Sequence, residues 1–132
     1  QGTLPVNSGW HDTQMDIGVD GNLYGDVWPY GAGLNAGPVA RNQWQQYTLT
    51  YDVDSQVCSL YINGQLKSLN SVIRQFGGSG LWYGIALTDS TGEGAEDASY
   101  LACDFSVFRV YNRALTTAEV FQNYQATSGR YS

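Results

Sequence analysis

Charged residues are scarce in this 132-residue sequence, and basic residues are the scarcest of them. There are 6 lysine and arginine residues against 12 acidic ones, so the net charge is −6 and the sequence pI is about 4.3. The basic residues are scattered along the chain without a cluster. Binding to nucleic-acid phosphates and docking on anionic lipid both depend on clustered cations, so we expect neither partner.

Long apolar runs are missing as well, and histidine and cysteine are rare. No run approaches the roughly 20 apolar residues of a membrane-spanning helix, so we expect no membrane insertion. The sequence has one histidine and two cysteines, and neither cysteine stands in a C-x-x-C arrangement. The cysteines alone cannot form a zinc site, and His11 without a second histidine is better explained as a loop residue than as a general base or metal ligand.

Aromatic residues and glycine, in contrast, are frequent. Aromatics make up 14% of the chain and glycine contributes 16 residues, which is typical of a turn-rich all-β protein. A helical bundle or a disordered chain would have a different composition. A chain of 132 residues suffices for one domain that buries about two thirds of its unfolded surface, so we expect a single domain over residues 1–132.

Two β-hairpins are predicted in the first half of the chain. Met15–Trp28 has apolar β-formers on both sides of an Asp-Gly-Asn turn. We expect Asp16, Asp20 and Asp26 to stabilise turns rather than to form a calcium site. Val57–Leu69 turns about Asn-Gly, the pair that a type I′ turn favours because both of its residues need positive φ. Between the hairpins, Pro29–Arg41 is rich in Gly, Pro and Ala, which predicts a loop.

Alternating side chains predict a half-buried strand before the second hairpin. Over Trp44–Tyr51, the apolar face consists of Tyr47, Leu49 and Tyr51. The first arm of the second hairpin has the same pattern. Its core face is predicted to consist of Cys58, Leu60 and Ile62.

The C-terminal part of the sequence combines a strand pattern with a helix. Cys103–Tyr111 alternates bulky apolar and polar residues, which predicts a strand. Thr116 as N-cap and Glu119 three residues later form a capping-box sequence, which predicts a helix start. Leu115 and Val120 have the spacing of a hydrophobic staple across that start.

Three stretches of the sequence resemble laminin-G-like domains of the concanavalin A-like lectin/glucanase superfamily. FRVYNRALTTAEV at residues 108–120 resembles the C-terminal signature of these domains, and NQWQQYTLTYD at Asn42–Asp52 and SLYING at Ser59–Gly64 resemble two earlier strands, in the same order. The resemblance implies an antiparallel β-sandwich of the concanavalin A-like jelly-roll type with one short C-terminal helix. The usual first strands of the family find no match, so the chain is either a minimal variant or part of a longer parent chain.

The family hosts lectins, adhesion modules, hydrolase appendages and virion proteins, so the fold alone leaves the function open. The resemblance implies first a non-catalytic module that binds a glycan or a protein partner, located extracellularly, at the cell surface or in a virion. The alternative is a structural module of a virion, tail fibre or surface layer that assembles with other chains. Asp52 and Asp54 alternate but follow a predicted strand and suit a turn, so paired-carboxylate hydrolysis has no site and we do not expect an enzyme.

Candidate ligand-binding rings stand beside glycine-rich stretches. Trp28 and Tyr30 open the predicted loop, and Trp82 follows a Gly-Gly-Ser-Gly run. Exposed rings beside closely approachable backbone suit the stacking of a sugar, although the same rings would also suit core or edge packing. We expect the recognition surface to combine one of these rings with an acidic loop that follows Trp82.

The acidic loop holds the densest charge of the chain. Its four acids are Asp89, Glu93, Glu96 and Asp97. A solvated loop of this kind costs little free energy. The alternative is a calcium site, because a cation would relieve the repulsion between the carboxylates, and Asp89 is then also a candidate ligand-binding residue.

The two cysteines allow two interpretations. Cys58 and Cys103 each lie near the start of a predicted strand. Two buried thiols that act as small apolar residues and one disulfide that joins the strands are about equally compatible with these positions. If the protein is extracellular, we expect the disulfide.

Overall fold

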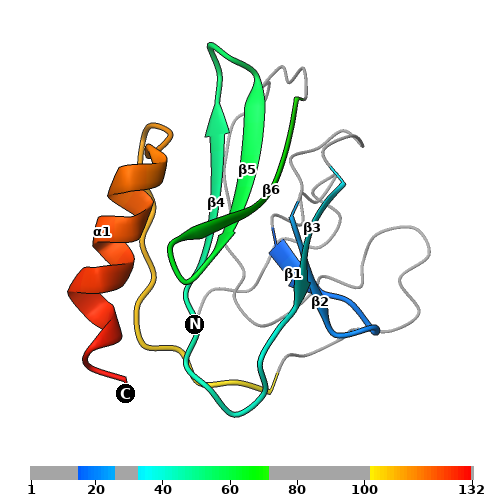
Figure 1. The fold of residues 1–132 in the computed structure, drawn as a ribbon, viewed down its shortest axis with the longest axis vertical. Helices are drawn as coiled ribbons and strands as arrows, with labels where there is room; N and C mark the ends of the chain where they lie inside the picture. The colour runs from blue at the N-terminus through cyan, green and yellow to red at the C-terminus, as the bar shows by residue number, and fades with distance from the viewer. Residues whose placement is uncertain (1–14, 26–32, 72–101, 132) are drawn as a thin grey trace, which may run out of the picture. The chain divides into compact units, whose positions relative to one another are not determined.

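The computed structural model describes residues 15–25, 33–71 and 102–131, which form six strands and one helix (Figure 1). The chain divides into two compact units, one of residues 1–12 and 76–109 and the other of residues 13–75 and 110–132. All the strands and the helix of the described part belong to the second unit. The single domain over residues 1–132 stays a prediction.

The first sheet contains three antiparallel strands in the order β1-β2-β3. Their bounds are Met15–Ile17 for β1, Asn22–Gly25 for β2 and Leu34–Pro38 for β3. The turn between β1 and β2 is built around Asp20, whose carboxylate accepts hydrogen bonds from the backbone N–H of Asn22 at 3.0 Å and from the Tyr24 hydroxyl at 2.7 Å. The first predicted hairpin and the turn role of Asp20 are therefore confirmed.

Strand β3 corrects the prediction of a loop over Pro29–Arg41. Leu34–Pro38 of this segment pairs with β2 through a register that shifts between Asn22 and Tyr24, as in a β-bulge. Because β3 is the edge strand, it needs a partner on one side only, which is where Pro and Gly are tolerated in sheets. Gly37 takes a φ of +83° and Pro38 ends the strand, so the residues that argued for a loop occupy the positions that a strand allows them.

The second sheet is also antiparallel, in the order β4-β5-β6. Its strands are Tyr47–Asp52 for β4, Val57–Ile62 for β5 and Gln65–Ser71 for β6. The second predicted hairpin is confirmed, with φ of +52° at Asn63 and +74° at Gly64. Asp52 accepts hydrogen bonds from the backbone N–H groups of Asp54 at 2.9 Å and Ser55 at 3.3 Å, so it is the turn residue that the sequence predicted.

Side chains from both sheets form one buried cluster. Its members are Leu23 and Leu34 from the first sheet and Cys58, Leu60 and Ile62 from the second. The predicted apolar face of β4 packs against this cluster, which confirms its alternation: Tyr47, Leu49 and Tyr51 are partly buried there. Two sheets with a shared core make the protein an all-β sandwich, as the sequence predicted.

Helix α1, Thr117–Ser128, covers the opposite face of the second sheet (Figure 1). Because successive side chains of a strand point to opposite faces, Tyr61 points away from the core that contains Leu60 and Ile62. Tyr61 instead forms a second buried cluster with Leu115 and Val120. Strand β5 is therefore covered on both faces.

The start of α1 has the predicted capping box. The backbone N–H of Glu119 donates to Thr116 Oγ1 at 3.3 Å, and the backbone N–H of Thr116 donates to Glu119 Oε2 at 2.8 Å. Leu115 and Val120 are buried in the same cluster, which agrees with the predicted staple. The chain therefore enters the helix at a position that both local hydrogen bonds and apolar packing determine.

The strand predicted over Cys103–Tyr111 is absent from the structure. Residues 102–111 have no regular secondary structure, and none of the strands in the described part pairs with them. Five apolar side chains of this segment are exposed: Phe105, Val107, Phe108, Val110 and Tyr111. The alternation of apolar and polar residues indicates only that the side chains suit a strand. A strand also needs a neighbouring backbone that exchanges hydrogen bonds with it.

Candidate functional site: a groove between the second hairpin and the C-terminal helix

Most of the site residues predicted from the sequence lie outside the described residues. These are Trp28, Tyr30, Trp82, Asp89, Glu93, Glu96 and Asp97. The ring-based site and the calcium site therefore stay predictions. In residues 15–25, 33–71 and 102–131, no group of three or more His, Cys, Asp and Glu side chains is placed to hold a metal ion.

The two cysteines lie in different environments. Cys58 is fully buried in the core between the sheets, whereas Cys103 is exposed. Both are thiols in the structure. Since Cys103 belongs to the first unit and Cys58 to the second, the disulfide between them stays a prediction.

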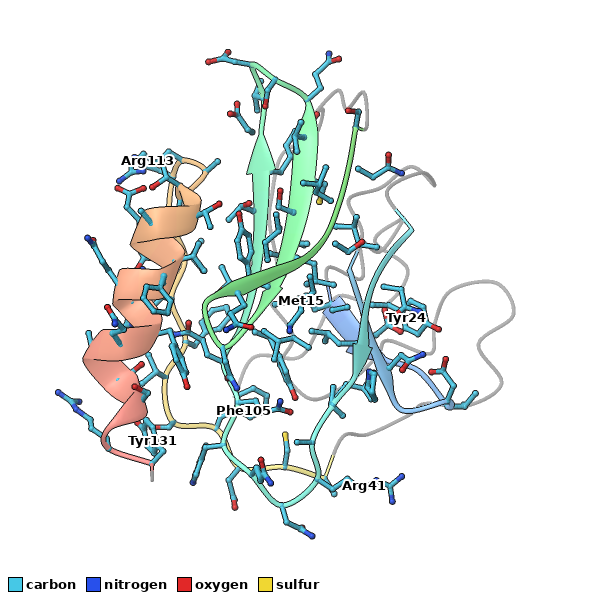
Figure 2. All side chains as sticks on the ribbon, in the orientation of Figure 1. Met15, Tyr24, Arg41, Phe105, Arg113 and Tyr131 are labelled. Carbon is cyan, nitrogen blue, oxygen red and sulfur yellow. The ribbon has the colours of Figure 1, made fainter. Side chains whose placement is uncertain are left out.

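A groove of about 450 Å³ lies between β3, the β5–β6 hairpin and α1, all within the second unit. Its polar and aromatic lining comes from Gln45, Asn63, Gln65, Lys67, Phe121 and Tyr124. Its remaining lining is apolar and comes from Ala36, Pro38 and Ile62. Figure 2 draws the side chains of α1 and of the hairpin. We call this feature the hairpin–helix groove.

Gly64 brings the hairpin turn into direct contact with the helix. A Cβ atom at this position would lie 3.0 Å from the Cα atom of Phe121 and 3.0 Å from the Cβ atom of Tyr124. The φ of +74° also favours glycine, so two independent constraints select the same residue. Close approach of the turn to α1 therefore sets one end of the hairpin–helix groove.

Asn63 fixes the same turn to the chain before β4. Its Oδ1 atom accepts a hydrogen bond from the backbone N–H of Gln46 at 2.9 Å, and its own N–H donates to the Gln46 carbonyl at 2.8 Å. The carbonyl oxygen of the Asn63 side chain is thus used for structure. The side-chain NH₂ group makes no hydrogen bond within the described residues and remains a donor for the groove.

Gln45 is held in the same way through its oxygen. Its Oε1 atom accepts hydrogen bonds from the backbone N–H of Ala40 at 2.8 Å and from the Tyr47 hydroxyl at 3.0 Å. Two acceptor bonds fix the orientation of the side-chain amide, so its NH₂ group is also oriented as a donor. The groove therefore has two amide donors whose positions are set by contacts outside it.

Two aromatic rings line the helical side of the groove. Phe121 and Tyr124 are three residues apart on α1 and so lie on one face of the helix. Their ring centroids are 6.5 Å apart with an interplanar angle of 37°. Phe121 keeps 41% of its surface exposed, although it packs on the hairpin turn. Apolar ring surface is therefore accessible beside the amide donors.

Lys67 alone carries a charge among the described residues that line the groove. It lies on β6 and is exposed. The groove thus combines two rings, three side-chain amides and one ammonium group, a set that can stack a ring and exchange hydrogen bonds with hydroxyl or carboxylate oxygens.

The sequence predicted the turn and the helix that form this groove, but it did not predict that they come together. The Asn-Gly turn and the start of α1 each have a local sequence signal, whereas their contact depends on tertiary packing. Gly64 is the one local signal for this contact, because a glycine at a turn permits the close approach of another element. Phe121 and Tyr124 would otherwise be taken as ordinary helix residues.

Residues 6–121 match a laminin-G family model described as the concanavalin A-like lectin/glucanases superfamily. The matched range includes all three sequence motifs. A crystal structure of an S-layer domain-containing protein (residues 221–444) from Clostridium thermocellum ATCC 27405 is similar at 22% identity and a TM-score of 0.47, covering 78% of this chain and 50% of that chain. A comparison with curated protein sequences finds no match. In the described part of the chain, no helix has the length and apolar character that crossing a membrane requires.

Proposed function

Because the chain belongs to the concanavalin A-like lectin/glucanase superfamily, we propose that it is a non-catalytic recognition module that binds a glycan at a cell or particle surface. The observation that carries this proposal is the hairpin–helix groove, where two aromatic rings lie beside three side-chain amides. A sugar has an apolar face and a rim of hydroxyl groups. It therefore suits a site that combines ring surface with hydrogen-bond donors.

The size and construction of the groove support this function. Its volume of about 450 Å³ falls within the range of roughly 300–1,000 Å³ that is typical of small-ligand sites. Its donors are oriented before a ligand arrives, because Asn63 and Gln45 are each held through their side-chain oxygens. Pre-orientation lowers the entropy cost of binding.

The described lining of the groove gives no support to hydrolysis. Glycoside hydrolysis commonly uses two carboxylates about 5–10 Å apart, and no Asp or Glu is among the described lining residues. Asp52 is used in a turn, where two backbone hydrogen bonds help to lower the pKa of its carboxyl group. A binding role requires no such pair.

A glycan array probed with the purified chain tests the proposal. We expect binding that Phe121→Ala weakens by about fivefold, because stacking on one ring is worth about 1 kcal/mol. Phe105→Ala is the matched control, since Phe105 is also an exposed phenylalanine but belongs to the other unit. Full binding by the Phe121 variant, with loss in the control, would place the site away from the groove.

The rings and acids predicted from the sequence remain candidates for a second part of the recognition surface. Trp28, Tyr30 and Trp82 are tested by alanine variants on the same array. Calcium at the acidic loop is proposed as a structural ion of that surface. A protein partner in place of a glycan would leave the array blank for every variant.

The alternative function is a structural module of a virion, tail fibre or surface layer. In that case the chain should assemble with copies of itself or with the rest of a longer parent chain, and bind no glycan. Light scattering after size-exclusion chromatography measures the oligomeric state. A concentration-dependent multimer with a blank array would favour assembly over recognition.

A further inference from the structure

Lys67 occupies an irregular position in the β5–β6 ladder. Leu60 pairs with Ser68 and Tyr61 pairs with Leu66, so Lys67 is the extra residue of β6 at this step. An extra residue of this kind forms a β-bulge, which redirects a side chain relative to the regular alternation and is common beside functional sites. Ser68 takes the place opposite the buried Leu60, and Lys67 is directed to the groove lining.

The position of β6 explains why this side chain reaches the groove. Strand β6 contacts both β3 and α1, the two elements on either side of the groove (Figure 1). A lysine redirected from β6 therefore adds its ammonium group to a site whose rings come from α1 and whose amides come from the chain around the hairpin turn.

The charge of Lys67 has no acidic partner within the described residues. The ion pair found there joins Arg113 to Glu119, at the first turn of α1. Lys67 is also the only lysine of a chain with a net charge of −6. A cation in a groove whose described lining has no carboxylate favours a ligand that supplies the negative charge itself.

We propose that the hairpin–helix groove prefers a sugar acid, a saccharide whose carboxylate pairs with Lys67 while its ring stacks on Phe121 or Tyr124. This inference rests on the proposed function and narrows it from glycans in general to carboxylated ones. A single lysine matches a single carboxylate as a point charge. A densely sulfated chain would require several cations, and the described groove has one.

The test compares ligands that differ only in the carboxylate. Oligosaccharides that contain hexuronic acid are paired with their neutral hexose analogues, and binding of the full chain is measured at low salt. We expect the acidic member to bind about two- to fivefold more tightly, the range for an exposed ion pair. Added salt should reduce this preference, because it screens the charges.

Variants separate the ammonium group from the overall charge. Lys67→Gln should abolish the preference for the acidic sugar while binding of the neutral analogue persists, and Lys67→Arg should retain the preference. Arg41→Gln removes the same charge from the connection between β3 and β4 and should change nothing (Figure 2). Equal loss in the Arg41 and Lys67 variants would assign the preference to net charge and overturn the inference.

The sole lysine also gives a direct spectroscopic probe. Reductive methylation with ¹³C-formaldehyde labels Lys67 and the N-terminal amine, and the Lys67 signal is the one that Lys67→Gln lacks. We expect this signal to shift with the acidic sugar and to move little with the neutral analogue. If neutral sugars bind equally well and Phe121→Ala weakens both, the proposed function stands and the preference fails. If no saccharide of either kind binds, both fail.

Discussion

Arg113 and Glu119 form a two-point ion pair across the first turn of α1 (Figure 2), with Nη2 to Oε1 at 2.6 Å and Nη1 to Oε2 at 2.9 Å. The same carboxylate accepts the backbone N–H of Thr116. The C-terminal motif of the family resemblance, residues 108–120, therefore has a structural role in this chain. It determines where the last helix begins.

The ion pair makes stability depend on pH in the acid range. The hydrogen bonds from Arg113, and then those from Thr116, lower the pKa of Glu119 from the ordinary 4.5 to about 2. A carboxyl group with a lowered folded-state pKa stabilises the fold fully above about pH 4.5, and this contribution is lost as the pH falls toward about 2. We expect the stability difference between the native chain and Glu119→Gln to be constant from pH 7 to 5 and to shrink below that.

Urea unfolding of both proteins at a series of pH values measures this difference. Asp20 and Asp52, whose pKa values are also lowered by hydrogen bonds, are present in both proteins, so their contributions cancel. A difference that stayed constant down to pH 2 would show that the ion pair does not stabilise the fold in solution.

The N-cap residue can be tested separately from the ion pair. Thr116→Ala should lower the free energy of unfolding by about 1 kcal/mol, the usual cost of a lost N-cap, because the backbone N–H of Glu119 loses its acceptor. Binding on the glycan array should not change, since Thr116 does not line the hairpin–helix groove. A loss of affinity larger than the loss of stability would make the start of α1 part of the binding site.

Gly64 should be much less tolerant of alanine than other glycines with positive φ. Gly64→Ala forces an unfavourable backbone conformation and also brings a Cβ atom to 3.0 Å from α1, so we expect a loss of about 1–3 kcal/mol. Gly21→Ala is the matched control, because Gly21 has a φ of +79° but nothing within 4 Å of the added atom. Chemical denaturation of both variants isolates the contact with the helix. Equal losses would mean that the turn and α1 do not touch in solution.

Calcium at the acidic loop predicts a change in thermal stability. We expect EDTA to lower the melting temperature and calcium to restore it, because a ligand that binds only the folded state stabilises that state by mass action. Magnesium at the same concentration is the control, since it requires a more regular octahedral geometry than calcium does. A melting temperature that responds to neither EDTA nor calcium would leave Asp89 and its acidic neighbours as solvated charge.

Local signals in the sequence predicted the elements that depend on local contacts. Asn63 and Gly64 specify their turn through backbone conformation, and Thr116 and Glu119 specify the helix start through hydrogen bonds within four residues. The alternation of β4 gave the correct core face for the same reason, since it reflects the strand's own period.

The secondary-structure predictions were wrong where pairing between distant segments determines the structure. Leu34–Pro38 has a loop-like composition but pairs with β2, whereas Cys103–Tyr111 has a strand-like composition but pairs with no strand of the described part. Neither outcome is encoded in the segment alone. The hairpin–helix groove could not be predicted for the same reason, because Lys67 and Phe121 line it together through the register of β6 and the docking of α1.

Strand β5 has hydrogen-bonded neighbours on both edges and packed side chains on both faces. A small local opening cannot expose its amide protons to solvent. Exposure requires the separation of β4 or β6 and the opening of two clusters of apolar side chains at once. Native-state hydrogen exchange should therefore be slowest in Val57–Ile62, at the rate of global unfolding. The three-residue β1 at the edge of the other sheet should exchange far sooner.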